Sequence, residues 1–130
     1  SITSKISVAC FFSIFSTSPL MANTVYQGSI VLLNELANPV ENITEEVEAE
    51  AETHQLFYVS NKADLAIEYM DSDKDGNRVG LITSLETFTA STGTLTIVLR
   101  HEPQKPNDGT PENAGGESDI EVTFDIEIQQ

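Results

Sequence analysis

The chain has no tryptophan and one cysteine, and only 6 of its 130 residues are lysine or arginine. The lone Cys10 cannot form an internal disulfide, and the sequence has no Cys/His cluster of the kind that holds zinc. Against the few cations stand 21 Asp and Glu residues, which leave a formal net charge of −15. Such a surface repels phosphate backbones and anionic headgroups, so we expect neither nucleic-acid binding nor electrostatic docking to membranes.

Long hydrophobic runs are also lacking. The apolar stretch from Ile6 to Phe15 is too short to cross a bilayer, which needs about 20 apolar residues. It follows Lys5 and precedes Leu20-Met21-Ala22, and this order predicts a signal peptide over residues 1–22. The mature protein would then be exported and begin near Asn23, without any segment inserted in a membrane. Two alternatives stay open, namely an extra strand that is apolar on both faces and a lipid attached at Cys10.

Residues 23–130 suffice for one domain, and their patterns are mostly those of strands. The clearest is residues 119–128, where apolar and acidic side chains alternate strictly, as in an antiparallel strand with one buried and one wet face. Short strands separated by turn signals predict an all-β fold, an antiparallel immunoglobulin-like β-sandwich with one short helix. The six expected strands cover residues 24–34, 55–60, 64–70, 79–88, 94–100 and 119–128.

The one expected helix covers residues 42–54. Asn42 and Glu45 have the spacing of a capping box, and acidic residues fill the first turn. Val47 belongs to a narrow apolar stripe, while the remaining face is almost all Glu. We therefore expect a short helix that docks through Val47 and ends at His54.

The sharpest candidate site is a calcium loop formed by Asp71, Asp73, Asp75 and Asn77. Carboxylates at alternate positions, followed by Gly, match the first half of a calcium-binding loop, in which the oxygens converge on one ion. The glutamate expected at loop position twelve is replaced by Ile82, so Glu86 or Asp64 would have to complete the site. The alternative is a hairpin turn whose carboxylates are screened by Lys74 or Arg78. A second acidic cluster in residues 107–119 has irregular spacing, and we expect a solvated loop there.

Four blocks of sequence resemble a family of small secreted proteins or lipoproteins of flavobacteria and their relatives. The blocks are NTVYQGSIVLLNE, ENITEEVEAEAETHQLFY, ASTGTLTIVLRHEPQK and NAGGESDIEVTFDIEIQ. That family is often labelled as having a type 1 periplasmic-binding fold, and the resemblance implies export but no particular activity. The labelled fold needs two α/β lobes and well over about 200 residues, so we retain the resemblance and not that fold. Residues 1–22 do not resemble the corresponding part of the family, and a truncated start is one expectation.

No pattern of catalytic residues stands out. The sequence has no nucleophile elbow, phosphate loop or dinucleotide fingerprint, and we expect that the protein is not an enzyme. The expected function is that of an exported acidic β-sandwich module of the cell envelope or extracellular space, with a binding or structural role. The alternatives are a calcium-stabilised adhesion module and a periplasmic small-ligand-binding protein. Whether the partner is a protein, a glycan or a small ligand stays open.

Overall fold

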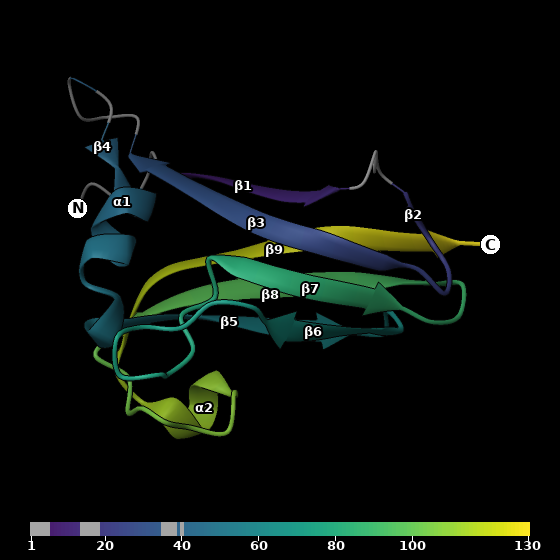
Figure 1. Cartoon of the computed structure of the whole chain (residues 1–130). Helices are drawn as coiled ribbons and strands as arrows, with labels where there is room; N and C mark the ends of the chain where they lie inside the picture. Colours follow the sequence, from purple (N-terminus) through teal and green to yellow (C-terminus); the bar gives the residue numbers. More distant parts are fainter. Residues whose placement is uncertain (1–5, 14–18, 35–38, 40) are drawn as a thin grey trace.

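The protein is mostly β and consists of two sheets, as the computed structural model shows (Figure 1). The structure describes residues 6–13, 19–34, 39 and 41–130. One sheet has the order β1-β3-β7-β6, and the short strand β4 pairs with the last two residues of β3. The other sheet has the order β2-β9-β8-β5. All paired strands are antiparallel except β2 and β9. Their bounds are β1 Ile6–Ser13, β2 Leu20–Met21, β3 Val25–Asn34, β4 Glu41–Asn42, β5 His54–Asn61, β6 Leu65–Tyr69, β7 Ile82–Thr87, β8 Ser91–His101 and β9 Glu117–Gln129.

The core lies between the two sheets. Alternate side chains of β3, including Ile30 and Leu32, pack with Leu95, Ile97 and Leu99 of β8 in a single apolar cluster. A second cluster nearer the other end joins Tyr26 and Leu85 of the first sheet with Ile128 of β9. Both clusters take residues from both sheets, so the architecture is sandwich-like, as the alternating patterns predicted.

All six expected strands are present, with changed bounds. Strand β7 is shorter than expected and begins at Ile82 instead of residue 79. Residues 79–81 instead belong to a loop in which the Asp71 carboxylate accepts hydrogen bonds from the amides of Gly80 and Leu81. Strands β8 and β9 are longer than expected. The predicted alternation of β9 is present, but its apolar face is only half-buried except at the buried Ile128, so the predicted burial is incomplete for most of that strand.

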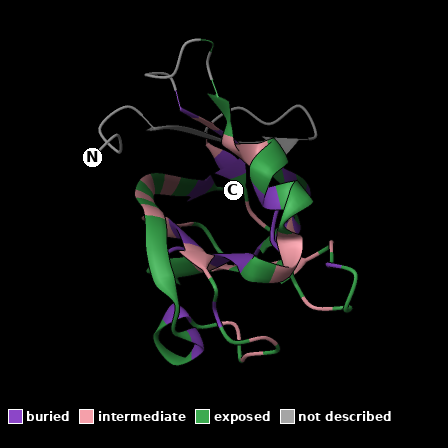
Figure 2. Ribbon diagram, turned by 90° about the vertical axis from the view of Figure 1, so that its left-hand side faces the viewer, coloured by how far each residue is buried: buried purple, intermediate pink, exposed green. Residues whose placement is uncertain are grey.

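The expected helix is present but shorter, because helix α1 covers Ile43–Ala49 and a 3-10 turn, η2, covers Ala51–Thr53. Asn42 caps it as predicted, since its side chain accepts a hydrogen bond from the Glu45 amide at 3.2 Å. Val47 is buried in the core, whereas the glutamates of the helix are exposed (Figure 2). His54 already belongs to β5, and its Nδ1 lies 3.0 Å from the Glu50 carbonyl oxygen, near the helix end.

The segment expected as a signal peptide or an extra strand contains β1 and β2. Strand β1 pairs antiparallel with β3 from Ile6 to Ser13, which is the arrangement of the strand alternative. The signal-peptide expectation concerns processing of the chain and stays a prediction. Lys5 and Phe15, at the two ends of that pattern, lie outside the described residues, as does Asn38, where the first expected strand was to stop.

The polar segment after β8 forms a folded loop and contains a second short helix, α2 (Pro111–Ala114). Ala114 packs with Phe57 and Val98 in a small cluster. The loop thus buries apolar residues of β5 and β8 that do not belong to the main core. Among the described residues, no helix has the length and apolar character that crossing a membrane requires.

Candidate functional site

The loop between β6 and β7 is organised by Asp71. One carboxylate oxygen, Oδ1, accepts a hydrogen bond from the Gly80 amide at 2.8 Å, and the other, Oδ2, accepts one from the Leu81 amide at 2.8 Å. Gly80 has φ +105°, and a side chain there would press against Leu56. The Asp71 carboxylate therefore closes the base of the loop by binding backbone amides.

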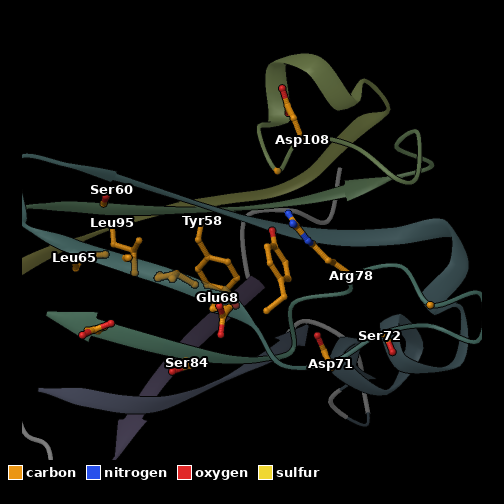
Figure 3. A pocket seen from close by; sticks show the side chains of 16 residues that line it. Tyr58, Ser60, Leu65, Glu68, Asp71, Ser72, Arg78, Ser84, Leu95 and Asp108 are labelled. Carbon is orange, nitrogen blue, oxygen red and sulfur yellow. The ribbon is translucent and has the colours of Figure 1, made fainter.

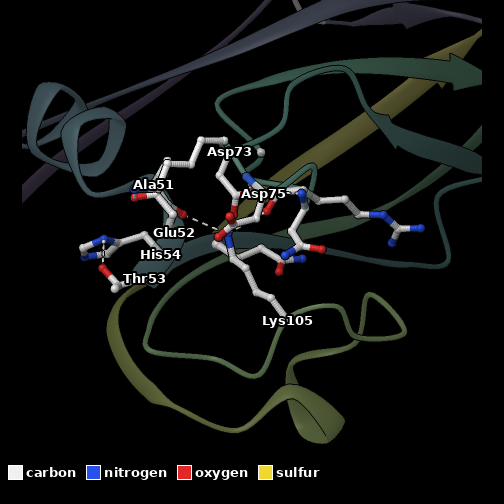
Figure 4. Close-up of polar contacts among 12 residues, drawn as sticks. Ala51, Glu52, Thr53, His54, Asp73, Asp75 and Lys105 are labelled. Carbon is white, nitrogen blue, oxygen red and sulfur yellow. Dashed lines mark hydrogen bonds and ion pairs between the residues drawn. The ribbon is translucent and has the colours of Figure 1, made fainter.

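The second carboxylate, Asp73, binds a lysine from a distant part of the chain (Figure 4). Its Oδ2 lies 3.1 Å from Nζ of Lys105, and only 1% of the Asp73 side chain and 6% of the Lys105 side chain are exposed. The same ammonium donates to the carbonyl oxygens of Ala51 at 2.8 Å and Arg78 at 2.9 Å. Lys105 thus ties the end of the α1–η2 segment, the acidic loop and its own loop together.

The other oxygen of Asp73, Oδ1, accepts hydrogen bonds from the amides of Asp75 and Asn77, each at 2.9 Å. Burial raises the pKa of Asp73, but the Asn77 amide, Lys105 and the Asp75 amide together outweigh it, and the net pKa is lowered. Both oxygens of this carboxylate are therefore already bound to donors that prefer its charged form.

The four predicted calcium ligands are close in sequence but do not converge. Asp71 and Asp73 each point at backbone amides, and the described residues contain no group of three or more acidic, His or Cys side chains placed to hold a metal. Asp64, a proposed extra ligand, accepts a hydrogen bond from the Thr89 hydroxyl at 2.6 Å. Calcium binding by Asp71, Asp73, Asp75 and Asn77 stays a prediction, and any calcium ion would have to compete with Lys105 for Asp73.

The screening cation expected from the sequence differs from the one in the structure. Lys74 is exposed and lies 3.9 Å from Glu52, and Arg78 contributes only its carbonyl oxygen to the Lys105 junction. Lys105 was missed because it lies far along the chain in a polar loop. In the sequence, Lys105 stands out only as one of 6 lysine and arginine residues in a strongly acidic chain.

Next to this loop, a groove of about 630 Å³ opens between the edge strands of the two sheets (Figure 3). Strand β5 forms one wall and β6 the other, the acidic loop and Asp108 close one end, and the buried Leu95 lies at the base. The lining residues that carry functional groups are Tyr58, Ser60, Glu68, Tyr69, Asp71, Ser72, Arg78, Ser84, Glu86 and Asp108.

Two tyrosines and one arginine form the centre of the groove. The rings of Tyr58 and Tyr69 meet edge to face with centroids 6.2 Å apart, and the Arg78 guanidinium carbon lies 5.3 Å from the centroid of the Tyr69 ring. The Tyr58 hydroxyl donates to the Gly80 carbonyl at 2.6 Å, and the Tyr69 hydroxyl donates to the Leu56 carbonyl. Burial raises the pKa of Tyr69 further above neutral pH. Both rings are thus held in place by backbone carbonyls.

Arg78 also borders a smaller cavity of about 140 Å³, lined by Gln55, Asn77 and Asn107 among others. Gln55 is 1% exposed, and its Oε1 accepts a hydrogen bond from Asn107 at 2.9 Å. Its amide nitrogen Nε2 is buried, and the Gln55 side chain also lies close enough to the Tyr69 hydroxyl to affect the pKa of that phenol. Arg78 therefore lines both the open acidic groove and the small polar cavity.

Asp108 shapes the end of the groove. Its Oδ1 accepts hydrogen bonds from the Thr110 hydroxyl at 2.7 Å and the Thr110 amide at 2.9 Å, and its Oδ2 accepts one from the Asn113 amide group at 2.7 Å. The Thr110 hydroxyl and the Asn113 amide group are the main reasons why the pKa of Asp108 is lowered to about 2. The second acidic cluster is therefore a hydrogen-bonded turn that leads into α2.

Comparison of this chain with known protein families, with curated proteins and with solved structures gives no match.

Proposed function

We propose that this protein is an exported binding module with an immunoglobulin-like fold, and that the groove between β5 and β6 is its ligand site. The strand order supports this fold. Taken in chain order as strands A to G, strands β1, β3, β7 and β6 correspond to A-B-E-D, and strands β9, β8 and β5 correspond to G-F-C. Export is supported by the resemblance to a secreted family and by the signal-peptide pattern of residues 1–22. Removal of that segment would take away β1 and β2 and leave β3 at the edge of its sheet, so strand A belongs to the unprocessed chain.

The observation that carries the binding function is the groove itself. Its volume of about 630 Å³ lies within the usual range for ligand pockets, roughly 300–1,000 Å³. The two tyrosines at its centre are hydrogen-bonded to the backbone, so the site is largely preformed. A preformed concave site costs less entropy on binding than a surface that must first be ordered.

The chemistry of the groove favours a neutral ligand rich in hydroxyl groups, such as a glycan. Glu68 and Glu86 are exposed acceptors on the two neighbouring strands β6 and β7, and Arg78, which also lines the groove, supplies donors. Hydroxyl groups both donate and accept, so one ligand can pair with carboxylates and with a guanidinium. An anionic ligand would be repelled by the surrounding carboxylates.

Nuclear magnetic resonance titration of the ¹⁵N-labelled protein with neutral oligosaccharides tests this proposal. We expect shifts confined to Tyr58, Glu68, Tyr69, Arg78 and their neighbours. The substitutions Arg78→Ala and Glu68→Gln should each weaken binding by about tenfold, the value of one hydrogen bond to a charged group. Glu112→Gln, on the exposed surface of α2, is the matched control and should bind normally. Absence of shifts in this groove with every sugar at ~10 mM, a concentration that detects even very weak complexes, would overturn the glycan proposal.

A further inference from the structure

Strand β9, the longest strand among the described residues, has one edge along most of which no other described strand lies. Strand β2 pairs with β9 only at Ile128 and Gln129, where the Ala22 amide donates to the Gln129 carbonyl at 2.6 Å. Backbone groups alternate between the two edges of a strand, and the β8–β9 register runs without a shift from Ile120 to Ile128. The amides and carbonyls that share the direction of Gln129 belong to Glu121, Thr123, Asp125 and Glu127. Apart from the Glu127 carbonyl, which the parallel bridge between Leu20 and Ile128 places against β2, no described strand pairs with them.

The core-facing side chains of β9 are buried beside β2 and become half-buried where the pairing with β2 stops. Ile128, beside β2, is 2% exposed. The other core-facing residues of the strand are only half-buried, although their neighbours on β8, such as Leu95 and Ile97, are buried. The half-buried residues are Ile120, Val122, Phe124 and Ile126. An added strand next to β9 would therefore cover apolar surface as well as satisfy backbone groups.

Apart from the acidic side chains of its outward face, this open edge lacks the devices that usually prevent pairing. Natural proteins protect long edge strands with proline, lysine, bulges or inward-pointing charges. Strand β9 contains no proline, glycine or lysine, and its core-facing positions from Ile120 to Ile128 are all apolar. The one register shift, between Leu99 and Arg100 of β8, lies near the start of β9. The rest of the edge is a regular template.

The charge of the outward face determines which strand fits. Glu121, Asp125 and Glu127 are exposed and lie on the same face as Thr123. A second copy of this chain pairing through β9 would place acidic side chains opposite one another, which destabilises a sheet. A strand with basic residues on that face would instead form opposite-charge pairs across the new ladder.

We propose that the open edge of β9 is a docking site for an extended segment of another protein in which apolar and basic residues alternate. The segment adds a strand to the sheet beyond β2. Its backbone pairs with Glu121, Thr123, Asp125 and Glu127, its apolar side chains cover Val122 and Phe124 among others, and its basic side chains face the acidic surface. Strand addition of this kind takes affinity from main-chain hydrogen bonds and specificity from alternate side chains.

The probe is a synthetic peptide of alternating lysine and valine, as long as the open edge. We expect it to slow hydrogen exchange of the Glu121, Thr123, Asp125 and Glu127 amides by at least about tenfold, because exchange then requires opening of the new ladder. The amides of Ile120 and Val122, which face β8, should change little. Two control peptides separate pairing from charge alone. One carries the same lysines and valines in two blocks, and the other replaces lysine with glutamate.

The matched variants are Thr123→Pro and Thr123→Val. Proline removes one open-edge amide and leaves the groups that face β8 intact, whereas valine keeps that amide. Both lose the 2.9 Å hydroxyl contact between Thr123 and Thr96. We expect the dissociation constant for the alternating peptide to rise at least tenfold in Thr123→Pro and to change less than twofold in Thr123→Val.

A charge reversal, Glu121→Lys with Asp125→Lys, provides a second test if the proline variant does not fold. This variant should bind the lysine peptide more weakly and the glutamate peptide more tightly. Equal binding of alternating and block peptides, or unchanged exchange at the four amides, would overturn the proposal. A concentration-dependent dimer with these amides protected in the absence of peptide would assign the edge to a second copy instead, and would also overturn it.

Discussion

The ammonium group of Lys105 lies 3.1 Å from Oδ2 of Asp73, and both side chains are almost completely buried. The two residues are 32 positions apart in the chain. The pair closes a loop that looks, from its sequence, like half of a calcium site. An internal lysine thus occupies the position beside Asp73 that a bound cation would need.

Replacing this lysine should strongly destabilise the protein. Lys105→Met leaves the buried charge of Asp73 without its partner and frees the carbonyls of Ala51 and Arg78. We expect the free energy of unfolding to fall by about 3 kcal/mol or more, as for other buried pairs that lose one member. Chemical denaturation monitored by circular dichroism would measure it. Lys74→Met, at an exposed ion pair, is the control and should cost less than about 1 kcal/mol.

The double variant Lys105→Met, Asp73→Asn should be more stable than Lys105→Met alone. The asparagine side-chain oxygen can still accept the Asp75 and Asn77 amides, while the buried charge is gone. The interaction energy of the two positions then follows from the double-mutant cycle. Additive losses would show that the pair is not coupled.

Calcium should have little effect on the native loop, because the ion must displace Lys105 from Asp73. We expect the melting temperature to be the same in millimolar calcium and in excess chelator. If Lys105 alone keeps calcium from Asp73, calcium should raise the melting temperature of Lys105→Met, since an ion that binds only the folded state stabilises by RT ln(1 + [Ca]/Kd). A rise of several degrees in the unmodified protein, abolished by Asp73→Asn with Asp75→Asn, would instead establish the calcium loop.

Helix α1 should depend on Val47 far more than on its glutamates. Val47 is 1% exposed and packs in the main core cluster. Val47→Asp should therefore cost at least about 2 kcal/mol, because it places a charge in an apolar contact. Glu50→Gln, at an exposed position, should change stability by less than about 0.5 kcal/mol. Thermal or chemical denaturation compares the two, and equally small losses would mean that the helix does not dock.

Acid should loosen the loops around the groove. The pKa of Asp108 is lowered from 3.8 to about 2, and that of Asp73 is also lowered. A carboxyl group with a depressed pKa contributes stability that is fully present above its unfolded pKa and is lost as pH falls through the folded pKa. For Asp108 the window is therefore about pH 4 to 2. Exchange of the Thr110 amide should rise in that window, and Asp108→Asn should show a smaller pH dependence.

Export of the chain predicts a processed N-terminus. Mass spectrometry of protein secreted by a Gram-negative host should find a chain that begins near Asn23 if residues 1–22 act as a signal peptide. An intact N-terminus whose β1 amides are protected from hydrogen exchange would support the strand alternative instead.

Local patterns in the sequence were enough to predict most elements. The alternation in β9 and in β8 has the period of a strand, and the Asn42–Glu45 spacing has the geometry of a helix cap, so each is encoded within a few residues. The predicted strand bounds are wrong where a side chain binds backbone groups that a strand would otherwise pair. The Asp71 carboxylate does this with the amides of residues 80–82. Such hydrogen bonds depend on loop geometry, and no periodicity reports them.

The sequence by itself determined the class of the protein. Its charge predicts that anionic partners are repelled, its alternation requires two faces of a sheet, and its acidic loop contains the carboxylates that any cation there would meet. Only the tertiary structure decided which cation that is and where a groove opens. Lys105 reaches Asp73 because two loops far apart in sequence meet at one end of the sandwich, and the groove exists because β5 and β6 are the edge strands of different sheets. Both are consequences of long-range packing, which links residues that share no local pattern.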